Sequence, residues 1–315
     1  MADETKHILL GAGGAISQCL ARELREHERP VKLVSRSGFA LPGCESMRAD
    51  LLDPDQTASA VEPGSTVYLL AGLPYDRRVW LEAWPKIMRN VIDACKNKSA
   101  RLVFFDNVYA YGRVKGPMTE ETPYHPSSIK GQIRATIVTE LQNEMAAGRL
   151  TALIARSADF YGPFADKVSL FNMFVTLRMA AGKKPQILAD ATTRHSLTYT
   201  GDCGKALRLL ADDPDAFGQV WHLPTAAPAL TMQQLVEIAA RKFDRKPDYT
   251  VMHGCFVKFG GLFKREVKEV AEMLYQNKYD YIFDSSKFEQ RYSFEPTGYA
   301  EGIAATIEAM GRESD

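Results

Sequence analysis

The stretch HILLGAGGAIS, residues 7–17, passes from an apolar strand into a glycine-rich turn, and a helical pattern follows over residues 16–27. Gly11 can adopt the positive φ of a tight turn, while Gly13 and Gly14 place no Cβ between the backbone and a ligand. The helix after the turn presents main-chain N–H groups to a phosphate. This order predicts a dinucleotide-phosphate site rather than a turn without a ligand. The residues predicted to form it are Gly11, Gly13, Gly14, Ala15 and Ile16.

Length and composition narrow the class of protein. The 315 residues allow one large α/β domain, or a nucleotide domain with a smaller lobe. Lys plus Arg equals Asp plus Glu at 39 each, so no overall charge attracts nucleic acid or an anionic membrane. The five cysteines and six histidines show neither disulfide nor metal-ligand spacing, and no apolar run reaches the length of a membrane span. We expect a cytoplasmic protein without a metal.

Apolar runs alternate with amphipathic stretches along the first half of the chain. These runs lie at 31–35, 66–72, 101–106 and 150–156. Strands that alternate with helices predict an α/β fold with a Rossmann-type, doubly wound parallel sheet, whose ligands bind beyond the carboxyl ends of the strands.

The alternation loosens after residue 157, where segments 231–243 and 264–276 have helical patterns. We therefore expect a dinucleotide-binding domain over residues 1–160. A smaller, mainly helical substrate lobe is expected over residues 161–315, interleaved with late strands of the main sheet.

The residues that follow the predicted strands after the first one indicate whether the cofactor is NAD or NADP. The segment Val34-Ser35-Arg36-Ser37 lacks the acid that commonly binds the ribose of NAD. Arg36 suits a 2′-phosphate, which favours NADP over NAD, the alternative being an ordinary surface arginine. Asp50 could accept from the adenine amino group or cap the helix near 54–61. The further predicted cofactor contacts are Ser35, Arg36, Asp50, Leu51, Ala71, Gly72 and Leu73.

Four segments together resemble one family. They are LLGAGGAIS (9–17), LVFFDNVYAYG (102–112), IARSADFYGP (154–163) and RHSLTYTGDCGKALRLL (194–210). In this order they make the chain similar, over nearly all residues, to the extended short-chain dehydrogenase/reductases, specifically the NAD(P)-dependent epimerase/dehydratase family. The resemblance implies a Rossmann domain and a lobe that often accepts a nucleotide-sugar. It also implies a homodimer through helices at about 78–96 and 127–147.

The chain departs from this family at its catalytic positions. The family uses a Tyr-x-x-x-Lys pair, in which the lysine holds the nicotinamide ribose and the tyrosine exchanges a proton. Lys130 is present, but Pro126 stands four residues earlier and cannot carry a proton. The position of the family's Ser or Thr falls on Phe105. Ser17 replaces the third glycine of the turn, and Asp159 replaces an asparagine.

Two groups could supply the missing proton. Tyr124 lies six residues before Lys130, although a surface loop tyrosine is the alternative. Asp106 and Asn107 occupy positions where dehydratases of the family carry an acidic pair, so Asp106 could be a general acid or a turn residue at the end of a strand. The candidate catalytic residues are Lys130, Tyr124 and Asp106; an ordered water is a further possible proton donor.

The resemblance also places substrate contacts in the second half of the chain. Arg194 and His195 fall where the family binds phosphates or sugar hydroxyls, the alternative for His195 being a buried histidine with a structural hydrogen bond. The predicted substrate-binding residues are Tyr75, Asp106, Asn107, Asp159, Phe160, Arg194 and His195. Two functions follow: an NAD(P)-dependent oxidoreductase, epimerase or dehydratase acting on a nucleotide-sugar or another small hydroxyl or carbonyl compound, or a catalytically inactive NADP-binding sensor.

Overall fold

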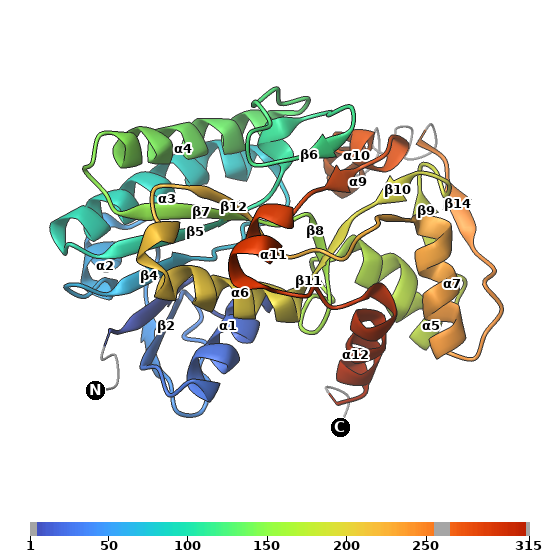
Figure 1. Ribbon diagram of the computed structural model, residues 1–315, viewed down its shortest axis with the longest axis horizontal. Helices are drawn as coiled ribbons and strands as arrows, with labels where there is room; N and C mark the ends of the chain where they lie inside the picture. Colours follow the sequence, from blue (N-terminus) through green and yellow to red (C-terminus); the bar gives the residue numbers. More distant parts are fainter. Residues whose placement is uncertain (1–4, 255–264, 313–315) are drawn as a thin grey trace. The chain divides into compact units, whose positions relative to one another are not determined.

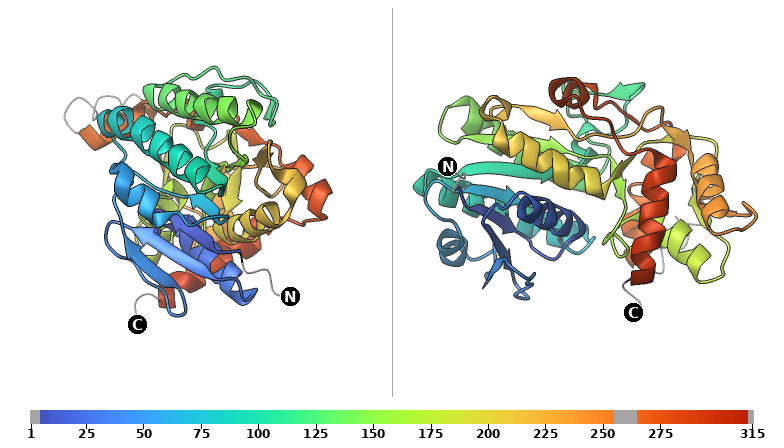
Figure 2. Two further views of the ribbon diagram at one scale, coloured as in Figure 1. Left: turned by 90° about the vertical axis from the view of Figure 1, so that its left-hand side faces the viewer. Right: turned by 60° about the horizontal axis from the view of Figure 1, so that its bottom comes forward.

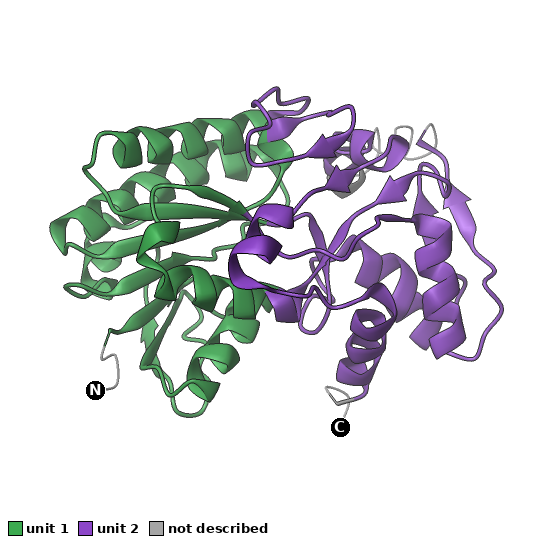
Figure 3. Ribbon diagram, viewed as in Figure 1, with its two compact units in different colours: residues 1–110, 130–156, 203–221 green, residues 111–129, 157–202, 222–315 purple. Residues whose placement is uncertain are grey.

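A computed structural model describes residues 5–254 and 265–312 (Figure 1). The chain forms two compact units and passes between them five times (Figure 3). Unit 1 comprises residues 1–110, 130–156 and 203–221, and unit 2 comprises residues 111–129, 157–202 and 222–315. The two units are of about equal length. Unit 2 also takes the segment 111–129, which lies within the predicted first domain.

Unit 1 is built on a seven-stranded sheet with the order β12-β7-β5-β4-β1-β2-β3. Its strands are β1 (His7–Leu10), β2 (Val31–Ser35), β3 (Glu45–Arg48), β4 (Thr66–Leu69), β5 (Arg101–Asp106), β7 (Ala152–Arg156) and β12 (Val220–His222). The pairings from β3 through β7 are all parallel. The strand order reverses between β1 and β4, which is where such sheets bind ligands. The predicted Rossmann-type fold is confirmed.

Helices cover both faces of this sheet, with α3 and α4 on one face and α1 and α6 on the other (Figures 1 and 2). Their bounds are α1 (Ala15–Glu26), α2 (Pro54–Ala60), α3 (Arg77–Asn97), α4 (Ile129–Ala146) and α6 (Thr200–Asp212). Ile16, Leu20 and Leu24 recur at a spacing of four in α1 and are buried, which is why this segment forms a helix packed on the sheet.

Unit 2 combines short strand pairs with short helices. The pairs are β8 (Asp159–Tyr161) with β11 (Leu197–Tyr199), β10 (Arg194–His195) with β13 (Leu230–Thr231), β9 (Gln186–Leu188) with β14 (Thr250–Met252), and β6 (Pro117–Met118) with β15 (Ile282–Phe283). The helices are α5 (Leu177–Ala180), α7 (Met232–Lys242), α9 (Arg265–Ala271), α10 (Tyr275–Lys278), α11 (Ser286–Tyr292) and α12 (Tyr299–Arg312). Tyr161, Leu235 and Ile303 are fully buried in the core of this unit.

The sequence predicts two helices in unit 2, over residues 231–243 and 264–276, and the structure agrees with the first and divides the second. The helix expected over 231–243 is α7, which begins with a capping box formed by Thr231 and Gln234. The single helix expected over 264–276 is instead two helices, α9 and α10; Lys264 and Cys255 lie outside the described residues.

No helix in the described ranges 5–254 and 265–312 is both long and apolar enough to cross a membrane. Within the same ranges, no three His, Cys, Asp or Glu side chains cluster in a way that could hold a metal ion.

Candidate nucleotide and substrate sites

The glycine turn of unit 1 has the conformation that its sequence requires. Gly11 has a φ of +93°, and a Cβ added there would lie 2.4 Å from the Cα of Ala71. Both the left-handed backbone and this close approach therefore demand glycine. Gly13 has a φ of +101°, and its added Cβ would lie 3.2 Å from the ring of Phe39. Gly14 is the N-cap of α1 and gives it no side-chain cap.

Ser17 braces this turn from within α1. Its hydroxyl accepts from the N–H of Gly13 at 3.0 Å and donates to the carbonyl of Gly14 at 2.8 Å. The N–H of Gly13 is thus used inside the turn. A diphosphate would instead meet the main-chain N–H groups at the start of α1, from Gly14, Ala15 and Ile16. Replacing the family's third glycine by serine leaves this binding surface in place.

The residues after β4 leave room beside the turn. Ala71 contacts Gly11 through its backbone, as described above. Gly72 is exposed, and a Cβ added to it would meet no atom within 4 Å. Leu73 is half-buried. These positions are compatible with the predicted contact to a cofactor.

A second arginine lies beside Arg36 at the predicted ribose end of the site. Arg36 is exposed after β2, whereas the hydroxyl of Ser35 accepts from the N–H of Phe39 at 2.9 Å. Arg48, in register with Ser35 on the neighbouring strand, covers the turn so closely that a Cβ on Gly38 would lie 2.6 Å from its Nε. Sequence reasoning missed Arg48, because only the β2–β3 register brings it here.

Asp50 does not cap α2, which corrects one of its two predicted roles. Its carboxylate accepts from the N–H of Leu52 at 3.0 Å. The N-cap of α2 is Asp53, whose side chain accepts from the N–H groups of Asp55 and Gln56. These hydrogen bonds lower the pKa of Asp53. Contact of Asp50 with adenine stays a prediction, and the neighbouring Leu51 is buried.

A phenol lies beside Lys130 within unit 1. Lys130 is fully buried in α4, and its Nζ lies 4.4 Å from the ring centroid of Tyr75. The hydroxyl of Tyr75 donates to that of Tyr109 at 3.4 Å, and the ring of Tyr75 packs edge-on against Trp80. Tyr75 was predicted only as a wall of the substrate pocket. Because it lies 55 positions before Lys130, no local spacing indicates this pair.

Asp106 is buried and held by two arginines, and its catalytic and substrate-binding roles stay predictions. It has no exposed surface; Arg134 Nε donates to its Oδ1 at 2.8 Å and Arg156 Nε donates to its Oδ2 at 2.9 Å. Both carboxylate oxygens are therefore occupied by guanidinium groups. The side chain of Asn107 accepts from the N–H of Tyr109 at 3.0 Å and thus stabilises the turn after β5. Both residues fit the structural alternative.

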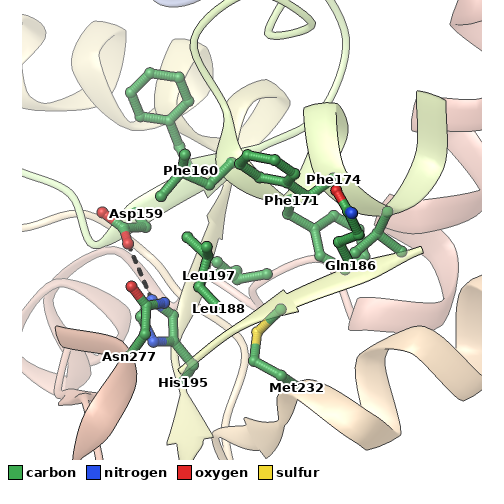
Figure 4. Close-up of a pocket in the computed structure, with 12 residues that line it drawn as sticks. Asp159, Phe160, Phe171, Phe174, Gln186, Leu188, His195, Leu197, Met232 and Asn277 are labelled. Carbon is green, nitrogen blue, oxygen red and sulfur yellow. Dashed lines mark hydrogen bonds and ion pairs between the residues drawn. The ribbon is translucent and has the colours of Figure 1, made fainter. Parts of the chain in front are cut away.

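Unit 2 contains a hollow of about 410 Å³, counting its open mouth (Figure 4). Most of its wall is aromatic or aliphatic, and its polar side chains are Asp159, Gln186, His195 and Asn277. Asp159 and His195 point toward one another, and the His195 Nε2 lies 3.0 Å from the Asp159 Oδ2 (Figure 4). The imidazole is buried and stacks on Tyr281 with 4.4 Å between ring centroids. The sequence predicted Asp159, Phe160 and His195 here, and the structure brings them together.

Two other predicted residues have different surroundings. Arg194 donates from Nε to the carboxylate of Asp280 at 2.9 Å, and its backbone N–H donates to the same side chain at 2.9 Å. It does not line the hollow. The ring of Tyr124 lies 5.9 Å from that of Tyr111 in unit 2. A role for Tyr124 in proton transfer stays a prediction.

The seven-stranded sheet and its flanking helices define a Rossmann-type α/β fold. The model of the NAD dependent epimerase/dehydratase family matches residues 7–223, and the chain belongs to this family. The predicted membership is confirmed. No curated protein sequence matches the chain.

Solved structures share the fold over almost the whole chain. MoeE5 in complex with UDP-glucose and NAD is 23% identical, with a TM-score of 0.80 over 98% of this chain and 100% of that one. UDP-glucose 4-epimerase from Thermotoga maritima, with UDP-glucose, is 18% identical, with a TM-score of 0.80 over 99% and 100% of the two chains. The Thermus thermophilus UDP-glucose 4-epimerase complex with NAD is 16% identical, with a TM-score of 0.79 over 98% and 99%.

Proposed function

We propose that this protein is an NAD(P)-dependent oxidoreductase, epimerase or dehydratase that acts on a nucleotide-sugar or another small hydroxyl or carbonyl compound. The observation that carries the proposal is the turn at Gly11 and Gly14, which precedes an uncapped helix at the reversal point of the sheet. Family membership supports it. So do the NAD and UDP-glucose bound to structurally similar proteins.

Different residues of unit 1 would bind different parts of the cofactor. Main-chain N–H groups from Gly14 to Ile16 would bind the diphosphate, and Lys130 would bind the nicotinamide ribose. Arg36 and Arg48 would bind a 2′-phosphate, which favours NADP, although NAD is also accommodated by the turn itself. When bound, such a cofactor accepts or supplies a hydride at a carbon that bears a hydroxyl or carbonyl group.

We assign proton exchange with the substrate oxygen to Tyr75, because its ring lies against the Nζ of Lys130. A nearby cation favours the phenolate form, so Lys130 would help this phenol to release and regain a proton. Tyr75 is 40% exposed, which leaves it accessible to a ligand. It would thereby take over the task of the tyrosine that Pro126 replaces.

Cofactor binding tests the first part of the proposal. Titration of NADPH, followed by its fluorescence, should show binding to the wild type and none to Gly11→Ala, because the added Cβ would overlap the backbone of Ala71. Gly64→Ala is the matched control: its φ is +66°, but its Cβ would meet nothing within 4 Å. Equal NADPH affinity in wild type and Gly11→Ala would contradict the site.

Cofactor selectivity tests the two arginines separately. We expect Arg36→Ala and Arg48→Ala each to weaken NADPH binding by about tenfold, the scale of one charge-assisted hydrogen bond, and to leave NADH binding unchanged. The same loss for both cofactors would argue against a 2′-phosphate site.

Turnover tests the role of Tyr75. A panel of UDP-glucose, UDP-glucuronic acid, uncharged sugars and ketones is screened by the absorbance of the reduced cofactor for net oxidation or reduction. Because epimerisation and dehydration return the cofactor to its starting state, their products are detected by chromatography. With any compound that reacts, Tyr75→Phe should lower kcat by at least about a hundredfold, whereas Tyr124→Phe should not. The reverse result would restore Tyr124 as the proton donor.

The loss of side-chain chemistry at Pro126 and Phe105 favours a second candidate, a cofactor-binding sensor without turnover. Tight NADPH binding together with no reaction across the whole panel would support that function instead. A homodimer through α3 and α4, and residence in the cytoplasm, stay predictions.

A further inference from the structure

The hollow of unit 2 has a lining without lysine or arginine in the part of the chain that the structure describes, whereas structurally similar proteins have been solved with UDP-glucose. Among the described residues that line it, Asp159 is the charged carboxylate and none is lysine or arginine. Asp159 is 25% exposed, so its charge faces a ligand that enters. The remaining wall is mainly aromatic or aliphatic, as in Phe160, Phe174 and Met232.

The histidine of the hollow is bound to this carboxylate. Its Nε2 lies 3.0 Å from the Asp159 Oδ2 and is therefore directed at Asp159 and not at a ligand. When the imidazole is neutral, the Nε2 proton is donated to Asp159, which leaves Nδ1 as an acceptor. That Nδ1 is buried and has no hydrogen-bond partner among the described residues. Asp159 is thus the member of the pair that a ligand can reach, and its carboxylate offers acceptors and no donor.

The nearest arginine in sequence is also neutralised. Arg194 is held by three hydrogen bonds to Asp280, one from its backbone N–H, one from its Nε and one from its Nη2. It lies outside the lining of the hollow. A diphosphate placed in the hollow would therefore face a carboxylate with no lysine or arginine among the described lining residues, and like charges in close contact oppose binding.

We propose that Asp159 is a specificity-determining residue that excludes diphosphate-bearing ligands from this hollow and selects an uncharged ligand with an apolar body and hydroxyl or amine donors. Asp159 would accept from those donors, and the aromatic walls would cover the apolar part. That this ligand is the substrate rests on the proposed function, and it narrows that function from nucleotide-sugars to small uncharged hydroxyl or carbonyl compounds. The exclusion of diphosphates rests on the hollow alone.

The test removes one charge and keeps the geometry. Asp159→Asn retains an oxygen that can accept from the His195 Nε2, so the variant should fold; its melting temperature checks this. Asp248→Asn is the matched control, because it removes an exposed carboxylate of the same unit that does not line the hollow. UDP-glucose and the uncharged phenyl β-D-glucoside are titrated by calorimetry against all three proteins.

We expect Asp159→Asn to bind UDP-glucose at least about tenfold more tightly than the wild type does. The gain should shrink in 1 M salt, the control should match the wild type within about twofold, and the affinity for phenyl β-D-glucoside should change by less than about threefold. Wild type and Asp159→Asn binding UDP-glucose equally, or neither binding it at all, would overturn the proposal. So would an equal gain for both ligands.

Titrations are run with and without NADPH. Absence of binding of both NADPH and NADH refutes the proposed function but leaves the comparison between the two ligands intact. Failure of the comparison in a protein that binds NADPH refutes only the specificity role of Asp159.

Discussion

Asp106 offers the sharpest test of the structural reasoning, because its predicted catalytic role and its observed contacts lead to opposite expectations. Asp106→Asn is nearly isosteric, yet it removes the negative charge that the buried guanidinium groups of Arg134 and Arg156 share. Removal of one partner from a buried ion pair costs about 3–5 kcal/mol in free energy of unfolding. For a unit of this size, that corresponds to a fall in melting temperature of roughly 6–20 °C.

A carboxylate of the same unit supplies the control. Asp212 also lies between two arginines, Arg29 and Arg208, each at 3.2 Å, but its side chain is 26% exposed. Water solvates such a group, so Asp212→Asn should cost about 1 kcal/mol or less. The two variants therefore change the same side chain in the same kind of pair and differ in burial.

Thermal unfolding is followed by circular dichroism, and NADPH binding is measured at 10 °C. The buried variant should melt well below the exposed one, while both still bind cofactor. Equal melting temperatures for the two variants would refute the argument. If Asp106→Asn melted like the wild type but lost turnover, the carboxylate would be catalytic after all.

Two further predictions concern unit 2. Burial raises the pKa of Glu120 in the folded protein above its unfolded pKa of 4.5. The protonated side chain therefore contributes to the free energy of unfolding below pH 4.5, and this contribution is lost as the pH rises through the folded pKa. Glu120→Gln keeps an acceptor for the backbone N–H of His222, and its melting temperature should exceed that of the wild type at pH 7 and converge on it toward pH 4; a constant offset across this range would contradict the linkage. Thr231→Ala removes the capping box shared with Gln234 and should cost about 1 kcal/mol, whereas Thr231→Ser should cost little; equal melting curves for the two variants would show that the cap does not contribute.

Much of unit 1 could be predicted because its signals are local. The apolar run at β1, the glycines after it and the helical spacing of α1 lie within 20 residues of one another. The turn after β2 shows the limit of this method. Arg36 could be found from its position behind a strand, but Arg48 required the register between β2 and β3.

The chemistry of the site depends on contacts that no local pattern contains. The arginines on Asp106 come from 28 and 50 positions further along the chain. Because these arginines could not be identified from the sequence, an acid at the end of a strand was equally compatible with a catalytic role and with a structural role. The pairing of Tyr75 with Lys130 likewise arises only when the loop after β4 meets α4.

Unit 2 was the least predictable part because its strands are too short to display alternation. Strand β10, for example, contains only Arg194 and His195. Two residues carry no periodicity, so their pairing partners come from tertiary packing alone. The identity of the pocket residues was nevertheless accessible through the family segment at 154–163.

The repeated passage of the chain between its units has a consequence for biosynthesis. Strand β12 (Val220–His222) completes the outer end of the sheet beside β7, so a ribosome must release more than two thirds of the 315 residues before that edge is covered. Until then β7 presents unpaired main-chain groups, the feature by which nascent polypeptides associate wrongly. A fragment that stops before residue 220 would keep this exposed edge permanently, which makes it a poor choice for expressing the nucleotide-binding half by itself.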